Sequence, residues 1–237
     1  MKIVAVIPAY NEEKSIGLVV SAIPRPLVSE VIVADNNSSD QTASVAIAAG
    51  ARVVFEKEAG YGAACLTGIA EARRLGTELI VFLDGDFSDY PEEIPQLVAP
   101  ILSGQYDMVI GSRILGQREP GSLTPQQRFG GWLACLLMRI FFRAQYSDLG
   151  PFRAISMQAL ERLNMRDRNY GWTVEMQIKA VRAGLRVKEI PVRYRKRIGT
   201  SKVSGTVKGV IGAGTKIIAT IFRYALQLAL LFCFSSV

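Results

Sequence analysis

Short, uniformly apolar stretches alternate with longer, mixed stretches through the first half of the chain. The apolar stretches predict strands at residues 3–7, 31–34, 53–55, 79–83 and 108–110, and the intervening segments predict helices at 12–23, 40–49, 62–75 and 91–103. Strands that are apolar on both faces and alternate with helices are typical of a parallel sheet covered by helices on both sides. We therefore predict an α/β fold for residues 1–111.

The pattern changes after Gly111. Residues 112–127 are rich in Gly, Pro, Gln, Ser and Arg and predict a long loop, and residues 129–142 predict a dense apolar helix. Farther along, the pattern predicts a helix at 172–183, an extended edge at 186–194 and a long apolar helix from 209 to 234.

Composition excludes several kinds of chemistry. The chain of 237 residues contains no histidine, which excludes Ser-His-Asp and Cys-His catalysis and histidine-ligated zinc. Its three cysteines lack the spacing of a zinc or disulfide motif. The sequence has no P-loop, which excludes a P-loop NTPase. It also lacks a Gly-x-Gly-x-x-Gly turn after the first strand, which argues strongly against a dinucleotide-binding oxidoreductase.

The positive charge is concentrated in one segment. Between Arg182 and Lys202 lie eight basic residues and one acid, an excess equal to the net charge of +7 of the whole chain. Such a segment predicts a polyanionic partner, such as a phosphorylated ligand, an anionic lipid or a nucleic acid, with a solvated basic face as the alternative. The segment contains one aromatic residue, Tyr194, and no nucleic-acid-binding motif, so we expect no nucleic acid partner.

Polar residues follow three of the predicted strands directly. They are the segments at 8–12, 35–40 and 84–86. In an open α/β sheet, ligands bind beyond the carboxyl ends of the strands, where these segments meet. Asp84 and Asp86, two residues apart, can approach one hard cation whose other ligands are phosphate oxygens. The alternative is that both aspartates only begin a turn before the helix that starts near Pro91.

These segments resemble family 2 glycosyltransferases with the GT-A fold, a Rossmann-like, mostly parallel sheet with helices on both faces. The resemblance rests on Val-Ile-Pro-Ala-Tyr-Asn-Glu-Glu after the first strand, Val-Ala-Asp-Asn-Asn-Ser-Ser-Asp-Gln-Thr after the second, Gly60-Tyr61-Gly62, and Asp84-Gly85-Asp86. Later segments, Asp148-x-x-x-Phe152-Arg153 and Arg197-x-Gly-x-Ser201-Lys202, are similar to the dolichyl- and polyprenyl-phosphate mannose or glucose synthase branch.

The resemblance implies a UDP- or GDP-hexose donor and Mg²⁺ or Mn²⁺ as cofactor. Asp84 and Asp86 would bridge the metal and the donor diphosphate, and Asp35 would contact the base. Ser88 replaces a glutamine that is common in that branch, and Asp89 is a candidate substitute ligand. The full set of implied donor-binding residues is Pro8, Ala9, Tyr10, Glu12, Asp35, Asn37, Gly62, Asp84, Gly85 and Asp86.

The resemblance also implies an acceptor phosphate contacted by Arg113, Arg118, Arg128, Arg197, Ser201 and Lys202. A phosphate acceptor is already anionic and needs little help from a base in an inverting transfer. A hydroxyl acceptor, the main alternative, would require a general base, for which Asp148 and Glu175 are the candidates. Two further candidate functions are a sugar nucleotidyltransferase, whose Gly-rich N-terminal loop is missing, and a basic nucleic-acid-binding module.

Two apolar segments predict contact with an anionic membrane surface. Residues 129–142 are too few to span a bilayer and suit an interfacial helix or a buried one. Residues 217–237 approach the thickness of the hydrocarbon layer, but Arg223 and Gln227 make a true span marginal. We predict a catalytic domain at 1–208, with an acceptor loop and amphipathic helix at 112–145, and peripheral attachment to the cytoplasmic membrane face, with 209–237 as a candidate shallow anchor.

Overall fold

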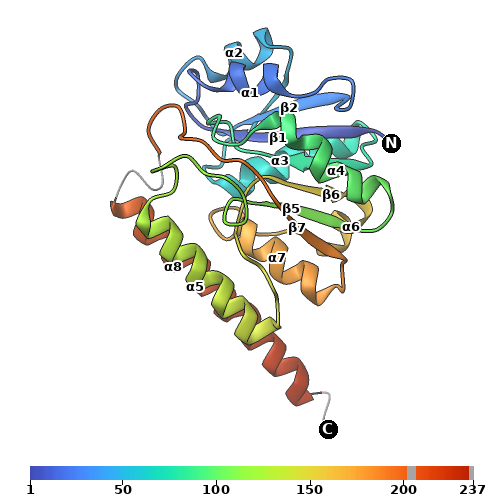
Figure 1. Cartoon of the computed structure of the whole chain (residues 1–237), viewed down its shortest axis with the longest axis vertical. Coiled ribbons are helices and arrows are strands. Elements are labelled where there is room, and N and C mark those ends of the chain that lie inside the picture. The colour runs from blue at the N-terminus through green and yellow to red at the C-terminus, as the bar shows by residue number, and fades with distance from the viewer. Residues whose placement is uncertain (202–206, 235–237) are drawn as a thin grey trace.

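The computed structural model describes residues 1–201 and 207–234, which form a seven-stranded sheet flanked by helices (Figure 1). The strand order is β3-β2-β1-β4-β6-β5-β7. The predicted α/β fold is confirmed, and six of these strands are β1 (Ile3–Ala9), β2 (Glu30–Asp35), β3 (Arg52–Phe55), β4 (Leu79–Phe82), β5 (Met108–Ser112) and β7 (Val187–Pro191).

Helices cover both faces of the sheet because the central strands are apolar on both sides. On one face, buried residues of β1 and β2 pack against α1 (Ile16–Ala22), α2 (Thr42–Ala48) and α4 (Ile94–Leu102), the last of which follows a short 3₁₀ turn at Pro91–Glu93. On the other face, the sheet packs against α3 (Tyr61–Arg74), α6 (Met157–Leu163) and α7 (Trp172–Arg182). These two layers hold the carboxyl ends of β1, β2 and β4 at one edge.

The remaining strand, β6 (Arg153–Ser156), runs antiparallel between β4 and β5. Arg153 is fully buried there, and its guanidinium donates to the backbone carbonyls of Leu149, Gly150 and Thr173. These bonds fix the 149–153 turn against α7. Arg153, which belongs to a segment similar to the family, therefore has a structural role in this fold.

Some helix boundaries in the structure differ from the predicted ones, because capping and tertiary contacts determine where these helices begin. The predicted 112–127 loop ends early, because Thr124 and Gln127 form a reciprocal capping box that starts α5 (Pro125–Phe142) at Pro125. The first helix begins at Ile16 instead of residue 12, and α6 was not predicted. The expected edge at 186–194 is confirmed as β7, the last strand of the sheet.

Helices α5 and α8 (Val207–Phe234) lie side by side along one flank of the domain (Figure 1). Residues including Met138 and Phe142 of α5, Ile178 of α7, and Ile221 and Tyr224 of α8 share one buried cluster. In the part of the chain that the structure describes, no helix combines the length and apolarity needed to cross a membrane. Residues 235–237 of the predicted 217–237 segment lie outside that part.

Candidate functional site

A cavity of about 490 Å³ opens at the carboxyl ends of β1, β2 and β4. This is the edge at which the sequence predicted ligand binding. Ten of the predicted site residues line it, namely Pro8, Ala9, Tyr10, Glu12, Asn37, Asp84, Gly85, Asp86, Arg197 and Ser201. Asn36, Ala59, Gly60, Tyr61, Ala64, Asn169 and Tyr170 complete the lining.

Side-chain amides join the loops around this cavity. Asn11 has a left-handed backbone (φ 53°), and its Oδ1 accepts the amide N–H of Ser39 (2.8 Å), which links the loops after β1 and β2. Asn36 donates from Nδ2 to the carbonyl of Glu58 (2.7 Å) and accepts the amide N–H of Gly60 (2.8 Å). Asn36 thus fixes the loop after β3 beside the cavity. Hydrogen bonds therefore join the loops after β1, β2 and β3 into one rim of the cavity.

Three carboxylates lie close together after β4: Asp86 and Asp89 are buried, and Asp84 is half-buried. The amide of Asp84 donates to Asp89 Oδ2 (3.3 Å), and Tyr61 donates from its hydroxyl to Asp84 Oδ1 (3.1 Å). Burial and the neighbouring charge of Asp86 raise the pKa of Asp84 to about 7. Burial, together with the charges of Asp84 and Asp86, also raises the pKa of Asp89 well above its ordinary value. This cluster is electrostatically unfavourable without a nearby cation.

The carboxylate pair suits a divalent cation that shares a phosphorylated ligand. Asp84 and Asp86 both line the cavity, and carboxylate and phosphate oxygens are the ligands that Mg²⁺ prefers. Asp89 Oδ1 is buried without a hydrogen-bond partner among the described residues. In the described part of the chain, no group of three or more Asp, Glu or Cys side chains is arranged to ligate one ion. The ligand would therefore complete the coordination of a metal at Asp84 and Asp86.

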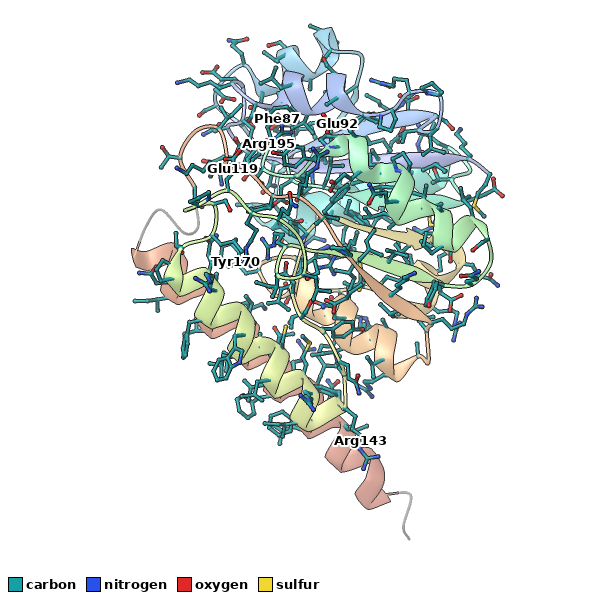
Figure 2. All side chains as sticks on the ribbon, in the orientation of Figure 1. Phe87, Glu92, Glu119, Arg143, Tyr170 and Arg195 are labelled. Atoms are coloured by element: carbon teal, nitrogen blue, oxygen red, sulfur yellow. The ribbon has the colours of Figure 1, made fainter. Side chains whose placement is uncertain are left out.

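The segment after β7 folds over the Asp84–Asp89 loop. The amide of Arg195 donates to the carbonyl of Ser88 (3.0 Å), and that of Ile198 to the carbonyl of Asp86 (2.9 Å). The guanidinium of Arg195 stacks on the Phe87 ring, 3.5 Å from its centroid (Figure 2). Arg197 pairs with Glu12 (2.6 Å) and Asp86 (3.1 Å). Arg197 is therefore a cation already present beside the predicted metal pair.

Much of the basic segment is used to hold the fold together. Arg186 pairs with Asp107 (2.7 Å), Arg193 pairs with Glu93 (2.6 Å), and Arg195 stacks on aromatic rings. The prediction that this segment as a whole faces a polyanion is therefore wrong for these three residues. Of its predicted phosphate contacts, Arg197 and Ser201 lie in the cavity, and Lys202 lies outside the described residues.

A second cavity of about 300 Å³ lies between the loop after β5 and α5. Arg113 forms two short contacts with Asp148 there, Nε to Oδ2 and Nη2 to Oδ1, each 2.7 Å. Although burial opposes ionisation, the charge of Arg113 and its hydrogen bonds lower the pKa of Asp148. Arg113 also favours the charged forms of Asp84 and Asp89, so it connects the two cavities electrostatically. The lining includes Arg113, Leu123, Arg128, Trp132, Cys135, Leu136, Arg139 and Asp148.

Three predicted residues lie behind the cavity wall. Asp35 is buried at the end of β2, where its carboxylate accepts the amide of Ser38 (3.2 Å). Gly62 faces the Asp167 carbonyl, which would lie only 2.1 Å from a Cβ, so it permits close packing between α3 and the following loop. Glu175 binds backbone amides and Tyr224 instead of lining either cavity, which corrects the prediction that it faces substrate.

Arg118 and Arg128, both expected at an acceptor phosphate, lie in different surroundings. Arg128 is exposed at the start of α5 and lines the second cavity. Arg118 lines neither cavity. Its backbone forms a β-bridge with Tyr194. Its Nη1 is buried without a hydrogen-bond partner among the described residues. The second cavity thus contains Arg128 but not Arg118.

Asn169 and Tyr170 are site residues that sequence reasoning missed. They belong to the turn before α7, more than eighty residues beyond Asp84, and no local motif marks them. Two glycines in the sequence were an indirect signal of a close backbone contact. A Cβ at Gly60 would lie 2.1 Å from the carbonyl oxygen of Arg168, and a Cβ at Gly62 would lie 2.1 Å from that of Asp167. The Gly60-Tyr61-Gly62 segment is therefore shaped for contact with this turn.

Comparisons with known proteins agree with this geometry. The sequence profile of Glycosyl transferase family 2 matches residues 4–163. An uncharacterized glycosyltransferase of Mycobacterium bovis is 36% identical over 212 residues, which cover 88% of this chain and 93% of that protein. The undecaprenyl-phosphate mannosyltransferase of Micrococcus luteus is 28% identical over 224 residues, which cover 88% of this chain and 90% of that protein.

A solved structure shares the fold. Glucosyl-3-phosphoglycerate synthase of Mycobacterium tuberculosis, in complex with Mn²⁺, uridine diphosphate and phosphoglyceric acid, superposes with a TM-score of 0.77 at 26% identity. The match covers 94% of this chain and 78% of that one. With the profile match over most of the chain and the cavity at the expected sheet edge, the protein belongs to glycosyltransferase family 2 and has the GT-A fold.

Proposed function

We propose that this glycosyltransferase moves a hexose from a nucleoside-diphosphate sugar to a polyprenyl phosphate, with inversion at the anomeric carbon. The proposal is based on the presence of two cavities with different linings. One contains the Asp84–Asp86 carboxylates, and the other combines arginines with apolar side chains. Arg113 lies in the second cavity and acts electrostatically on the carboxylates of the first.

The first cavity is assigned to the donor. Asp84 and Asp86 would hold Mg²⁺ or Mn²⁺ together with the donor diphosphate, and the complexes of the mycobacterial synthase with Mn²⁺ and uridine diphosphate support this assignment. The metal would stabilise the negative charge that grows on the leaving diphosphate. Arg197 and Ser201 line this cavity, so we assign them to the donor phosphates and not to the acceptor.

The second cavity is assigned to the acceptor phosphate and the first part of its lipid chain. Arg113, Arg128 and Arg139 supply positive charge, and Trp132 and Leu136 supply apolar surface. Its only carboxylate among the described lining residues is Asp148, whose pKa is lowered by Arg113. An ionised, arginine-bound carboxylate is a weak base, which favours an acceptor that is already anionic. The Micrococcus luteus mannosyltransferase supports the same acceptor class.

A small phosphorylated acceptor with a reactive hydroxyl is the second candidate. The mycobacterial synthase, which is 26% identical to this chain, was solved in complex with phosphoglyceric acid. Such an acceptor would also suit the arginines of the second cavity. It would not use the apolar lining, and it would need a base at its hydroxyl.

The outer surface of α5 and α8 is proposed to contact an anionic membrane. Neither helix contains Asp or Glu, and Arg139, Arg143 and Arg223 are exposed (Figure 2 labels Arg143 at the far end of α5). Basic helices that expose aromatic residues bind the interfacial region of anionic bilayers. Among the side chains that the structure describes on these helices, the large exposed apolar ones are Phe129, Trp132, Ile140, Phe141, Ile211, Phe222 and Leu226.

Replacing Asp86 should abolish metal-supported use of the donor. Asp86→Asn keeps the volume of the side chain but removes its negative charge, and we expect turnover to fall by about 10²- to 10³-fold, the usual effect of losing one electrostatic contact at such a site. The measurement is nucleoside diphosphate release with Mn²⁺ and a nucleotide sugar. Asp107→Asn, a surface aspartate paired with Arg186, is the control. Near-normal turnover with unchanged metal dependence in Asp86→Asn would refute the metal assignment.

Replacing Arg128 should weaken use of a phosphate acceptor. Charge-assisted hydrogen bonds contribute about 1.5–3 kcal/mol, so Arg128→Ala should raise the acceptor KM roughly ten- to a hundredfold at saturating donor. Arg74→Ala, an exposed arginine on α3, should leave the acceptor KM unchanged. If acceptor titrations of the Arg128 variant matched those of the wild type, Arg128 would have no part in the acceptor site and the second candidate would gain support.

Removing exposed aromatic side chains from α5 should weaken membrane binding. Phe129→Ala and Trp132→Ala together remove two aromatic rings that lie 5.8 Å apart on α5, and we expect clearly lower co-sedimentation with anionic vesicles. Phe55→Ala removes an equally exposed ring from the sheet edge and should have no effect. Wild-type protein that stays in the supernatant with anionic vesicles at low salt would contradict the proposed membrane contact.

A further inference from the structure

Glu175 is a buried charge that the proposed transfer does not use. It lies in the first turn of α7 and is 1% exposed. Its carboxylate accepts the amide N–H of Asp167 (2.7 Å), the amide of Arg166 (3.1 Å) and the hydroxyl of Tyr224 (2.7 Å), and pairs with Lys179 (2.8 Å). A carboxylate with this many donors is bound in one place, which suits a positioning role.

Those hydrogen bonds hold the loop that forms one wall of the donor cavity. Asp167, whose amide binds Glu175, accepts the amides of Asn169 (2.8 Å) and Gly171 (3.1 Å) through Oδ1. Asn169 and Tyr170 line the same cavity as the Asp84–Asp86 segment, and Tyr170 lies on the side of the domain that faces α5 and α8 (Figure 2). The hydrogen bonds of Glu175 thus fix the conformation of this loop, and two of the loop's residues line the cavity assigned to the donor.

The same loop is pressed against α3 from its other side. The amide of Ala63 donates to the Arg168 carbonyl (2.9 Å), and Gly60 and Gly62 leave no room for a Cβ beside the loop backbone. A small shift of the loop would therefore move the Gly60–Gly62 segment, which carries Tyr61 and its hydrogen bond to Asp84. The position of the loop is therefore coupled through Tyr61 to the carboxylate of Asp84.

Helix α8 supplies two of the contacts. Tyr224 binds Glu175, and Lys216 pairs with Asp167 Oδ2 (3.1 Å). Tyr224 is buried in the cluster that joins α8 to α5 and α7. Although burial favours protonation, hydrogen bonds from Lys179, the Asp167 amide and Tyr224 lower the pKa of Glu175, so the carboxylate remains an acceptor near neutral pH.

We propose that Glu175, held by Tyr224 of α8, is a positioning residue for the sugar-nucleotide donor: it fixes the 166–171 loop so that Asn169 and Tyr170 form a wall of the donor cavity. The inference rests on the proposed function, because it takes the first cavity as the donor site. It gives α8 a role in donor binding that is separate from any contact with a membrane.

The test compares Glu175→Gln and Tyr224→Phe by titration calorimetry with UDP and with GDP, each with Mn²⁺, and by steady-state kinetics. We expect Glu175→Gln to raise the nucleotide Kd and the donor KM about tenfold, the effect of losing one charge-assisted contact, with kcat and acceptor KM within about threefold of wild type. Tyr224→Phe should raise the same two constants by a few fold. If Glu175→Gln does not fold, Tyr224→Phe carries the test alone.

Two controls separate positioning from general stability. Ile221→Val removes one buried methyl from the α8 cluster without touching Glu175, and it should lower the melting temperature but leave donor KM unchanged. In an Asn169→Ala background, Glu175→Gln should have a smaller effect on donor KM than in the wild type, because both changes act on one contact.

Three results would overturn the inference. Unchanged nucleotide Kd in variants of lowered melting temperature would make Glu175 a structural residue only. A large loss of kcat with unchanged donor KM would make it a candidate base. If the wild-type protein bound neither UDP nor GDP in the presence of Mn²⁺, that result would refute the proposed function itself, and the inference with it.

Discussion

The crowding of three carboxylates within six residues, the buried Asp86 and Asp89 and the half-buried Asp84, is the constraint on which the site depends. Desolvation and mutual repulsion raise the pKa values of Asp84 and Asp89, so the fold has to hold the cluster together against an electrostatic cost. The strand that precedes it, β4, lies between β1 and β6 in the sheet and is apolar along its whole length. The free energy of burying these apolar strands offsets the electrostatic cost of the cluster.

Positive charge reaches the cluster from distant parts of the chain. Arg113 follows β5, and Arg197 follows β7, and each favours the charged form of Asp84. Arg195 holds the segment that carries Arg197 by stacking on Phe87 and by donating to its carbonyl (2.6 Å). The basic segment therefore has two roles: it binds the Asp84–Asp89 loop to the sheet edge and presents one arginine to the cavity.

Local pattern predicted those parts of the molecule that local interactions decide. The apolar strands, the polar segments after β1, β2 and β4, and the Asp84–Asp86 pair all follow from short stretches of sequence. The antiparallel insertion of β6 could not be predicted in this way, because it depends on strand pairing across more than forty residues. Glu175 was placed wrongly for the same reason: its partners at 166–167 and 224 come together only in the folded chain.

The most direct measurement is the mass of the product formed from undecaprenyl phosphate. Purified protein is incubated with Mn²⁺ and a panel of UDP- and GDP-hexoses, in parallel with undecaprenyl phosphate and with phosphoglyceric acid. We predict a lipid product heavier than undecaprenyl phosphate by one hexosyl group. Transfer to the hydroxyl of phosphoglyceric acid, with no hexosyl lipid formed from any donor, would contradict the assignment of a polyprenyl-phosphate acceptor.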